Sequence, residues 1–362
     1  MTHARNRTSD DCHHVTGAQS KMKLVLIGQF ADEHLGFHLR AAAGDLGLDT
    51  HCLEAARAYA GPLLSRKANW WLRGRRPNRL DSFSGEVARD CRDFRPEVVL
   101  TTGLAPVHAA AVRQIRALGA RTVNYLTDDP WNAAHHAPWF LEALPCYDHV
   151  FSPRRANLDD LRRAGCPSVH YVPFAYAPHV HHPEEPTPAE RTALESDVIF
   201  AGGGDRDRVP YITALRKAGL TIALYGGYWD HFPETRALSR GKASPAFLRK
   251  AIRSSKVALC LVRRANRDGH SMRTFEVPAV GAAMLMENTE EHRDLFGPEG
   301  QAALYFDHIP EMTEKARWLL DHGAERARLA EAARRIVTLG AHTYRDRLCQ
   351  MLTLTGVAPV RS

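Results

Sequence analysis

The sequence lacks several features that identify a protein class at first sight. It has seven cysteines in 362 residues and no Cys-x-x-Cys pair, so we expect neither a disulfide framework nor a structural zinc site. No apolar run reaches the roughly 18 residues of a membrane span. The first 20 residues, which we expect to be a disordered tail, have no apolar core like that of a signal peptide. These absences favour a cytoplasmic globular protein.

Several ligand-binding fingerprints are missing as well. No glycine turn matches the G-x-G-x-x-G pattern of dinucleotide-binding proteins or the phosphate loop that ends in Gly-Lys-Ser/Thr, which disfavours a nicotinamide enzyme or an ATPase. Histidines gather at 135–136 and 179–182 without partners at metal-ligand spacing, so no metal site is expected. Because zinc-finger spacing, an RNP-like aromatic motif and a basic heptad helix are also absent, nucleic acid is not expected as a partner.

What the chain does have is an arginine-rich, basic composition and enough length for two domains. The formal net charge is +7 and the pI is about 9.1, which suits a phosphate, a pyrophosphate or an anionic membrane surface as partner. Hydrophobic residues make up 44% of the chain, so a large core can form.

Apolar runs of strand length alternate with helical patterns along the chain. This alternation predicts an α/β protein in which two Rossmann-like, doubly wound parallel sheets face one another across a cleft. Strands are expected at 23–28, 96–103, 122–126, 149–151 and 170–172, and then at 197–201, 220–225, 257–262, 283–286 and 303–305. A stretch rich in Pro and His, 173–188, separates the two series and has the composition of a linker. We therefore expect domains at 21–180 and 197–340, a linker at 181–196, and a C-terminal helix and tail at 341–362.

The most informative segment runs from Asp268 to Gly281, where a turn follows an apolar run and opens a helix. Free N–H groups of the first helical turn and the positive end of the helix dipole favour an anion at such a turn. We expect Arg273 to add a forked contact to a diphosphate and Glu276, one turn deeper, to accept hydrogen bonds from ribose hydroxyls. The other members of the predicted donor-binding turn are His270, Ser271 and Met272. The alternative is an ordinary strand-to-helix turn with solvated side chains.

Other glycine turns fall at the same expected sheet edge, outside the carboxyl ends of strands. Gly202 and Gly203 would let the backbone approach a ligand closely, and Gly226 follows the next strand in the same way. Arg208, at the start of the following helix, would neutralise a pyrophosphate leaving group. A flexible turn with solvated arginines is the alternative interpretation.

Two more turns are expected to line the cleft. The turn at 241–245 contains Lys242 and Ala243, and its amides are placed to contact a nucleobase edge, although helix capping alone would explain it. Asp128 and Asp129 follow a strand end in the first domain, where a carboxylate would act as a base toward an acceptor hydroxyl or hold a donor sugar. An aspartate-rich turn with a helix cap is the competing interpretation.

The segment from 65 to 79 interleaves Trp70 and Trp71 with a dense cluster of cations. This composition is typical of an interfacial or phosphate-binding surface, so peripheral membrane contact is one expectation. The other is a mobile loop with one of the tryptophans packed on the domain.

Taken together, these residues resemble the glycosyltransferases related to the spore-maturation protein CgeB, which have the two-domain GT-B fold. The resemblance rests on 271–281, on 200–202 with Arg208, on 224–226 with Trp229, and on 342–347. In the broader retaining GT-B transferases two glutamates stand eight positions apart, the second on the nucleotide ribose and the first near the donor sugar. Glu276 matches the second position, and Asp268, one methylene shorter, stands at the first. The resemblance thus implies a nucleotide-diphosphate sugar as donor substrate and no further cofactor.

We therefore expect a metal-independent glycosyltransferase with an unidentified acceptor. Asp128, Asp129, Asp268 and Arg273 are its catalytic candidates, and Arg273, Arg208 and turn amides would stabilise the departing diphosphate. A nucleotide-sugar epimerase on the same fold is one alternative. A non-catalytic scaffold that kept the nucleotide cleft is another, because Asp268 replaces the expected glutamate.

Overall fold

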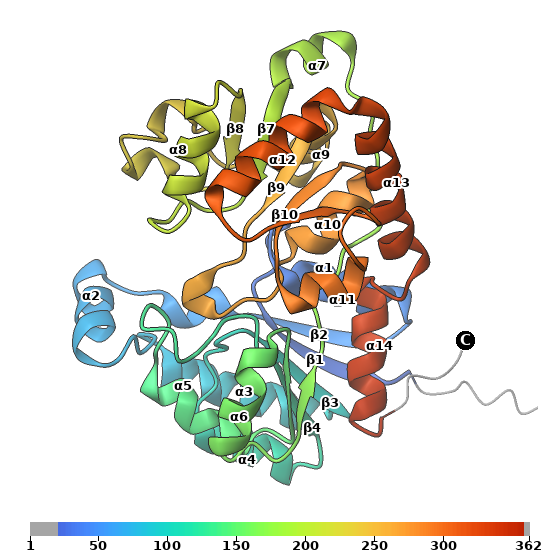
Figure 1. Ribbon diagram of the computed structural model, residues 1–362. Coiled ribbons are helices and arrows are strands. Elements are labelled where there is room, and N and C mark those ends of the chain that lie inside the picture. The colour runs from blue at the N-terminus through green and yellow to red at the C-terminus, as the bar shows by residue number, and fades with distance from the viewer. Residues whose placement is uncertain (1–20, 358–362) are drawn as a thin grey trace, which may run out of the picture.

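Two parallel sheets with helices on both faces make up the computed structural model, which describes residues 21–357 (Figure 1). The tail predicted at 1–20 and the end of the predicted C-terminal segment, 358–362, lie outside the described residues. The sheet of β1 to β6 with its helices is called the first domain below, and the sheet of β7 to β11 with its helices the second.

The first domain is built on a six-stranded sheet in the order β2-β1-β3-β4-β5-β6. Its strands are β1 (Lys23–Gly28), β2 (Asp49–Glu54), β3 (Val98–Thr102), β4 (Arg121–Tyr125), β5 (His149–Ser152) and β6 (Val169–Tyr171). Val25 and Ile27 pack on one face against α3 (Leu80–Phe94), α4 (Ala109–Ala117), α5 (Pro138–Ala143) and α6 (Leu158–Arg163). Leu24 and Leu26 pack on the other against α1 (Leu35–Asp45). The sequence pattern missed β2, an edge strand in which only Leu53 is buried.

The second domain has a five-stranded sheet in the order β11-β10-β9-β7-β8. Its strands are β7 (Ser196–Ala201), β8 (Ile222–Tyr225), β9 (Ser255–Cys260), β10 (Met284–Glu287) and β11 (Leu304–Phe306). One face is covered by α8 (Val209–Lys217) and α12 (Ile309–Asp321), the other by α9 (Pro245–Ser254), α10 (Arg273–Val280), α11 (Glu290–Phe296) and α13 (Gly323–Leu339). The predicted α/β class with two doubly wound parallel sheets is confirmed.

The chain passes between the domains twice. The first crossing leads to α7 (Pro188–Leu194), and on the way Glu184 and Glu185 form ion pairs with Arg249 and Arg253 of α9. The second leads to α14 (Tyr344–Leu354), which returns to the first domain and packs beside α1 (Figure 1). The two crossings meet in a parallel bridge between Tyr176 and Thr343.

The segment at 65–79 differs from the predicted loop. Its first half belongs to α2 (Leu63–Leu72), a helix in which no residue is buried. Trp70 lies under the guanidinium of Arg75, which is 5.3 Å from the ring centroid, whereas Trp71 is exposed.

Histidines that are buried in the neutral form should make the stability of the fold sensitive to acid. His292 accepts from the Thr274 hydroxyl (3.1 Å) and donates to the Glu287 carbonyl (2.8 Å), and burial lowers its pKa to about 4. Burial, reinforced by His179 and Arg273, also lowers the pKa of His38 to about 4. In the unfolded chain both histidines take up a proton near pH 6.5, whereas the folded protein resists protonation down to about pH 4. Stability is therefore complete above pH 6.5 and falls below it.

When the pH is lowered from 7.5 to 5, we expect the free energy of unfolding to fall by about 2 kcal/mol for each of these two histidines. Urea unfolding across this range checks the slope. His292→Gln should show a shallower pH dependence than the parent protein, because one proton fewer is taken up on unfolding. A parent protein equally stable at pH 7.5 and pH 5 would contradict the assignment.

Candidate active site

A cavity of about 280 Å³ lies between the two domains and is called the first cavity here. The first domain supplies the residues that follow its strand ends, and the second supplies the turn after β7, the start of α9 and the start of α10. The predicted site residues that line it are Asp128, Gly202, Gly203, Arg208, Ala243, Asp268, Ser271, Met272, Arg273 and Glu276. Residues far apart in the sequence therefore meet at the carboxyl edges of both sheets.

The floor of the first cavity is formed by the start of α10. Glu276 is 2% exposed and forms an ion pair with Arg273, whose Nε also donates to the Ala201 carbonyl at the end of β7 (3.1 Å). The second Glu276 oxygen lies 3.6 Å from His181 Nε2. Burial and the neighbouring Arg273 lower the pKa of His181 to about 2, so the ring beside Glu276 is neutral. Arg273 thus spans the cavity floor instead of extending freely into it.

The glycine turn after β7 forms one wall. Gly226 has a φ of 139°, and a Cβ at this position would come within 2.3 Å of the Gly202 carbonyl oxygen, so the close approach of the two turns requires glycine. Trp229 Nε1 donates to the same carbonyl (2.8 Å) and holds it in place. Gly226 therefore shapes the wall from behind and does not itself line the cavity.

Arg208 carries an unused donor at this wall. The side chain is buried and donates from a terminal nitrogen to the Gly203 carbonyl (2.8 Å), but its Nε has no partner among residues 21–357. A buried N–H without an acceptor costs free energy, typically 1–3 kcal/mol. Arg208 therefore keeps one donor whose hydrogen bond is not made within the described residues.

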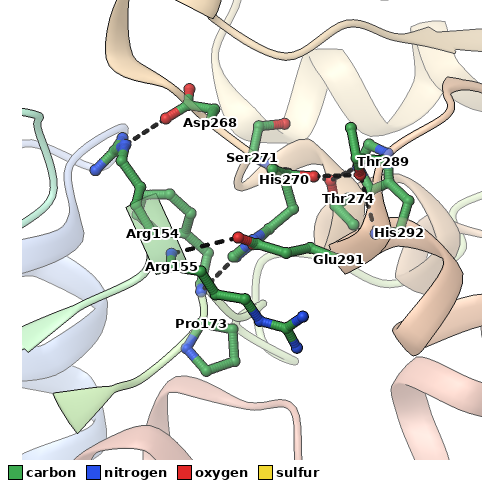
Figure 2. A network of polar contacts seen from close by, with 12 residues as sticks. Arg154, Arg155, Pro173, Asp268, His270, Ser271, Thr274, Thr289, Glu291 and His292 are labelled. Atoms are coloured by element: carbon green, nitrogen blue, oxygen red, sulfur yellow. Dashed lines mark hydrogen bonds and ion pairs between the residues drawn. The ribbon is translucent and has the colours of Figure 1, made fainter. Parts of the chain in front are cut away.

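Arg154 faces Asp268 across the cleft, and sequence reasoning did not select it. Both side chains are buried, and Arg154 Nε donates to Asp268 Oδ1, so an ion pair joins the domains at the cavity wall (Figure 2). Burial raises the pKa of Asp268, while Arg154 opposes the shift. One terminal nitrogen of Arg154 has no partner in the described part of the chain. The position of Arg154 just after β5, at the carboxyl edge of a parallel sheet, was a signal that could have found it.

His270 lies outside the first cavity, although the sequence predicted it in the donor-binding turn. The Phe174 N–H donates to His270 Nε2 (3.1 Å), and Nδ1 contacts Glu291. Glu291 also accepts from the Tyr171 hydroxyl (3.0 Å) and the Arg155 backbone N–H (3.4 Å), as Figure 2 shows for Arg155. With both ring nitrogens engaged, His270 links the domains and is not available to a ligand.

The remaining predicted residues are also separated by the fold. Asp129 is buried and accepts from Arg267 Nε (2.6 Å) and the Trp131 N–H (3.0 Å), so it does not point into the cleft. Lys242 is exposed outside the cavity. Asp128, in contrast, faces the cavity with its side chain 36% exposed, and His135 Nε2 lies 3.8 Å from its carboxylate.

A second cavity, of about 380 Å³, lies in the first domain at the ends of β1 and β3. Its walls include the aromatic side chains of Tyr59, Trp70 and Trp139. Trp139 is 7% exposed, and its Nε1 has no acceptor among residues 21–357. Asp128 lines both cavities, so the same residue borders each of them.

Two further features are absent from the described part of the chain. Within residues 21–357, no three His, Cys, Asp or Glu side chains are grouped closely enough to hold a metal ion. None of the helices in this range combines the length and the apolar character needed to cross a bilayer.

Comparison with known proteins finds a family match in the C-terminal part of the chain and similar solved structures over most of it. Residues 208–353 match the family described as glycosyl transferase-like. No curated protein matches the sequence. One similar solved structure is sucrose-phosphate synthase from Thermosynechococcus elongatus, which is 13% identical and has a TM-score of 0.68. The alignment covers 92% of this chain and 98% of that chain. Anabaena HepE in complex with UDP-glucose has 11% identity, coverages of 92% and 99%, and a TM-score of 0.60. A putative UDP-N-acetylglucosamine 2-epimerase from Listeria monocytogenes has 14% identity, coverages of 92% and 96%, and a TM-score of 0.55.

These likenesses establish the fold of the protein. The chain has the GT-B fold, with two Rossmann-like domains that face one another across a cleft. The match to the glycosyl transferase-like family covers residues 208–353, which include Arg208, Arg273 and Glu276. The narrower relation to CgeB stays a prediction.

The ion pair between Arg154 and Asp268 should be essential for stability. Arg154→Met leaves the buried Asp268 carboxylate without its ion-pair partner in the first domain, so we expect a loss of about 3–5 kcal/mol in urea unfolding. Arg154→Met/Asp268→Leu should lose less, because neither charge is then stranded. The control is Arg155→Met, which removes a more exposed ion pair to Asp294 and should cost less than about 1 kcal/mol. Equal losses in Arg154→Met and Arg155→Met would overturn this view.

Proposed function

We propose that the protein is a glycosyltransferase that takes a sugar from a nucleotide-diphosphate donor in the first cavity and transfers it to an acceptor in the second, without a divalent metal. The observation that carries this proposal is the position of Asp128, which lines both cavities. An epimerase needs no second substrate beside its donor. A transferase needs two adjoining sites and a base between them.

The donor side is supported by the charges around the first cavity. Arg208 and Arg154 each carry an N–H without a partner in the described residues, and α10 begins at the cavity floor. These groups suit a diphosphate, whose negative charge grows as it leaves, and they take the place of a metal ion. Glu276 is held by Arg273 one turn inside α10, where it would accept from the ribose hydroxyls. The complex of HepE with UDP-glucose, on the same fold, supports a donor of this kind.

The acceptor side depends on Asp128. An acceptor hydroxyl from the second cavity would form a bond to the anomeric carbon of the sugar while the bond from that carbon to the diphosphate oxygen breaks. The hydroxyl proton would pass to Asp128, and the diphosphate would leave toward Arg208 and Arg154. His135, 3.8 Å from Asp128, would help to hold the carboxylate in place. The aromatic walls of the second cavity suit an acceptor with apolar faces, such as a sugar or an aromatic ring.

Incubation with radiolabelled UDP-, GDP- and dTDP-sugars, with and without EDTA, tests the proposal. We expect hydrolysis or transfer that survives EDTA. Asp128→Asn should reduce turnover by about 10²–10⁴-fold, the usual contribution of a general base, and leave nucleotide affinity unchanged. An isomerised donor would indicate the epimerase suggested by the likeness to the Listeria structure. Binding without turnover would indicate a scaffold, and loss of activity in EDTA would refute metal independence.

Glu276→Gln should weaken nucleotide binding by about 1.5–3 kcal/mol, because a charged acceptor to the ribose is lost. Isothermal calorimetry with the nucleotide that gives the largest thermal shift measures this. The matched control is Glu314→Gln, an exposed glutamate of α12 away from both cavities, which should bind normally. Unchanged affinity in Glu276→Gln would remove this residue from the nucleotide site.

A further inference from the structure

Helix α2 is amphipathic in the reverse sense of an ordinary surface helix. Leu64, Ala68, Trp71 and Leu72 recur at the spacing i, i+4, i+7 and i+8 and therefore share one face. In a soluble domain such a face packs on the core. Here it points to solvent: Leu64 is 81% exposed, Trp71 78% and Leu72 83%.

The side of α2 that carries Ser65 and Asn69 faces the segment that follows the helix. Asn69 donates to the side-chain oxygen of Asn78 (2.7 Å), and the Asn78 amide donates to the Ser65 hydroxyl (3.0 Å). Arg75, just after the helix, donates to the His136 carbonyl (2.7 Å). These contacts fix the helix with its apolar face outward, at the edge of the first domain and away from both sheets (Figure 1).

The charge around α2 identifies what would cover this face. Residues 61–79 contain six cations and no carboxylate. They are Arg66, Lys67, Arg73, Arg75, Arg76 and Arg79. A second copy of the chain would bring the same cations together and be repelled, whereas an anionic lipid surface complements the charge and accepts the leucines and Trp71. Exposed indole rings settle at the headgroup level of a bilayer.

We propose that α2 is an interfacial helix that docks the protein on an anionic lipid surface, with Leu64, Trp71 and Leu72 in the headgroup region and the surrounding cations on the lipid phosphates. Trp70 and Tyr59 line both the groove beside α2 and the second cavity. The docked surface therefore adjoins the second cavity. The proposal of docking rests on α2 and the cations around it, and it does not depend on the proposed transfer reaction.

Flotation of the full-length protein with vesicles tests the proposal. We expect it to float with phosphatidylcholine vesicles that contain 30% phosphatidylglycerol and to stay behind with phosphatidylcholine alone. Arg66→Ser/Lys67→Ser should lower the partition coefficient about 25-fold, since each cation near an anionic leaflet contributes about a fivefold factor. The matched control, Lys217→Ser/Arg335→Ser, removes the same charge from exposed positions of the second domain and should float like the parent.

The apolar face is tested in the same way. Leu64→Ser/Trp71→Ser/Leu72→Ser should abolish flotation while the melting temperature stays within about two degrees of the parent, because no residue of α2 is buried. Leu339→Ser, at another exposed leucine, is the control. Trp71→Phe should also lose the blue shift of tryptophan fluorescence that vesicles induce in the parent.

Three outcomes would overturn the proposal. The first is a parent protein that does not bind anionic vesicles at low salt. The second is a triple variant of α2 that floats as well as the parent. The third is a dimer, seen in sedimentation equilibrium, that dissociates in the triple variant while the parent does not bind vesicles, which would make the face an interface between copies.

Discussion

The ion pair between Arg154 and Asp268 joins the two domains at the wall of the first cavity, and the geometry of the cleft depends on it. Both side chains are buried, so separation of the domains at this point would break the ion pair between them unless water replaced it. The contacts of Glu291 with His270, Tyr171 and the Arg155 backbone extend the same junction. Together they set where Asp128 of the first domain lies relative to α10 of the second.

Two buried arginines, Arg154 and Arg208, line the first cavity. Arg154 uses one N–H on Asp268 and Arg208 uses one on the Gly203 carbonyl, and each keeps another donor without a partner in the described residues. Buried donors of this kind are costly in the free protein and favourable once a negative ligand is present. A site whose donors are already oriented needs little reorganisation when charge develops on a leaving group.

Apolar side chains are buried in the interior of the protein but exposed on α2. In the sheets, apolar side chains such as Val25 and Leu26 are fully buried on alternate faces, and the helices cover both. On α2 the leucines are exposed and the amide of Asn69 is turned inward. Apolar surface in contact with water costs free energy in proportion to its area. An exposed apolar face of this kind therefore indicates a surface that is covered when the protein works.

The sequence by itself determined the two sheets, because strands buried on both faces must be apolar runs and helices must lie between them. It also determined that Arg208, Arg273 and Glu276 lie at a strand-to-helix edge, since the carboxyl ends of parallel strands share one side of a sheet. It missed β2, an exposed edge strand. Only the tertiary structure decided that Asp268 is paired with Arg154 and Asp129 with Arg267, partners more than a hundred residues away. No local pattern encodes such contacts, because they arise from the packing of one domain on the other.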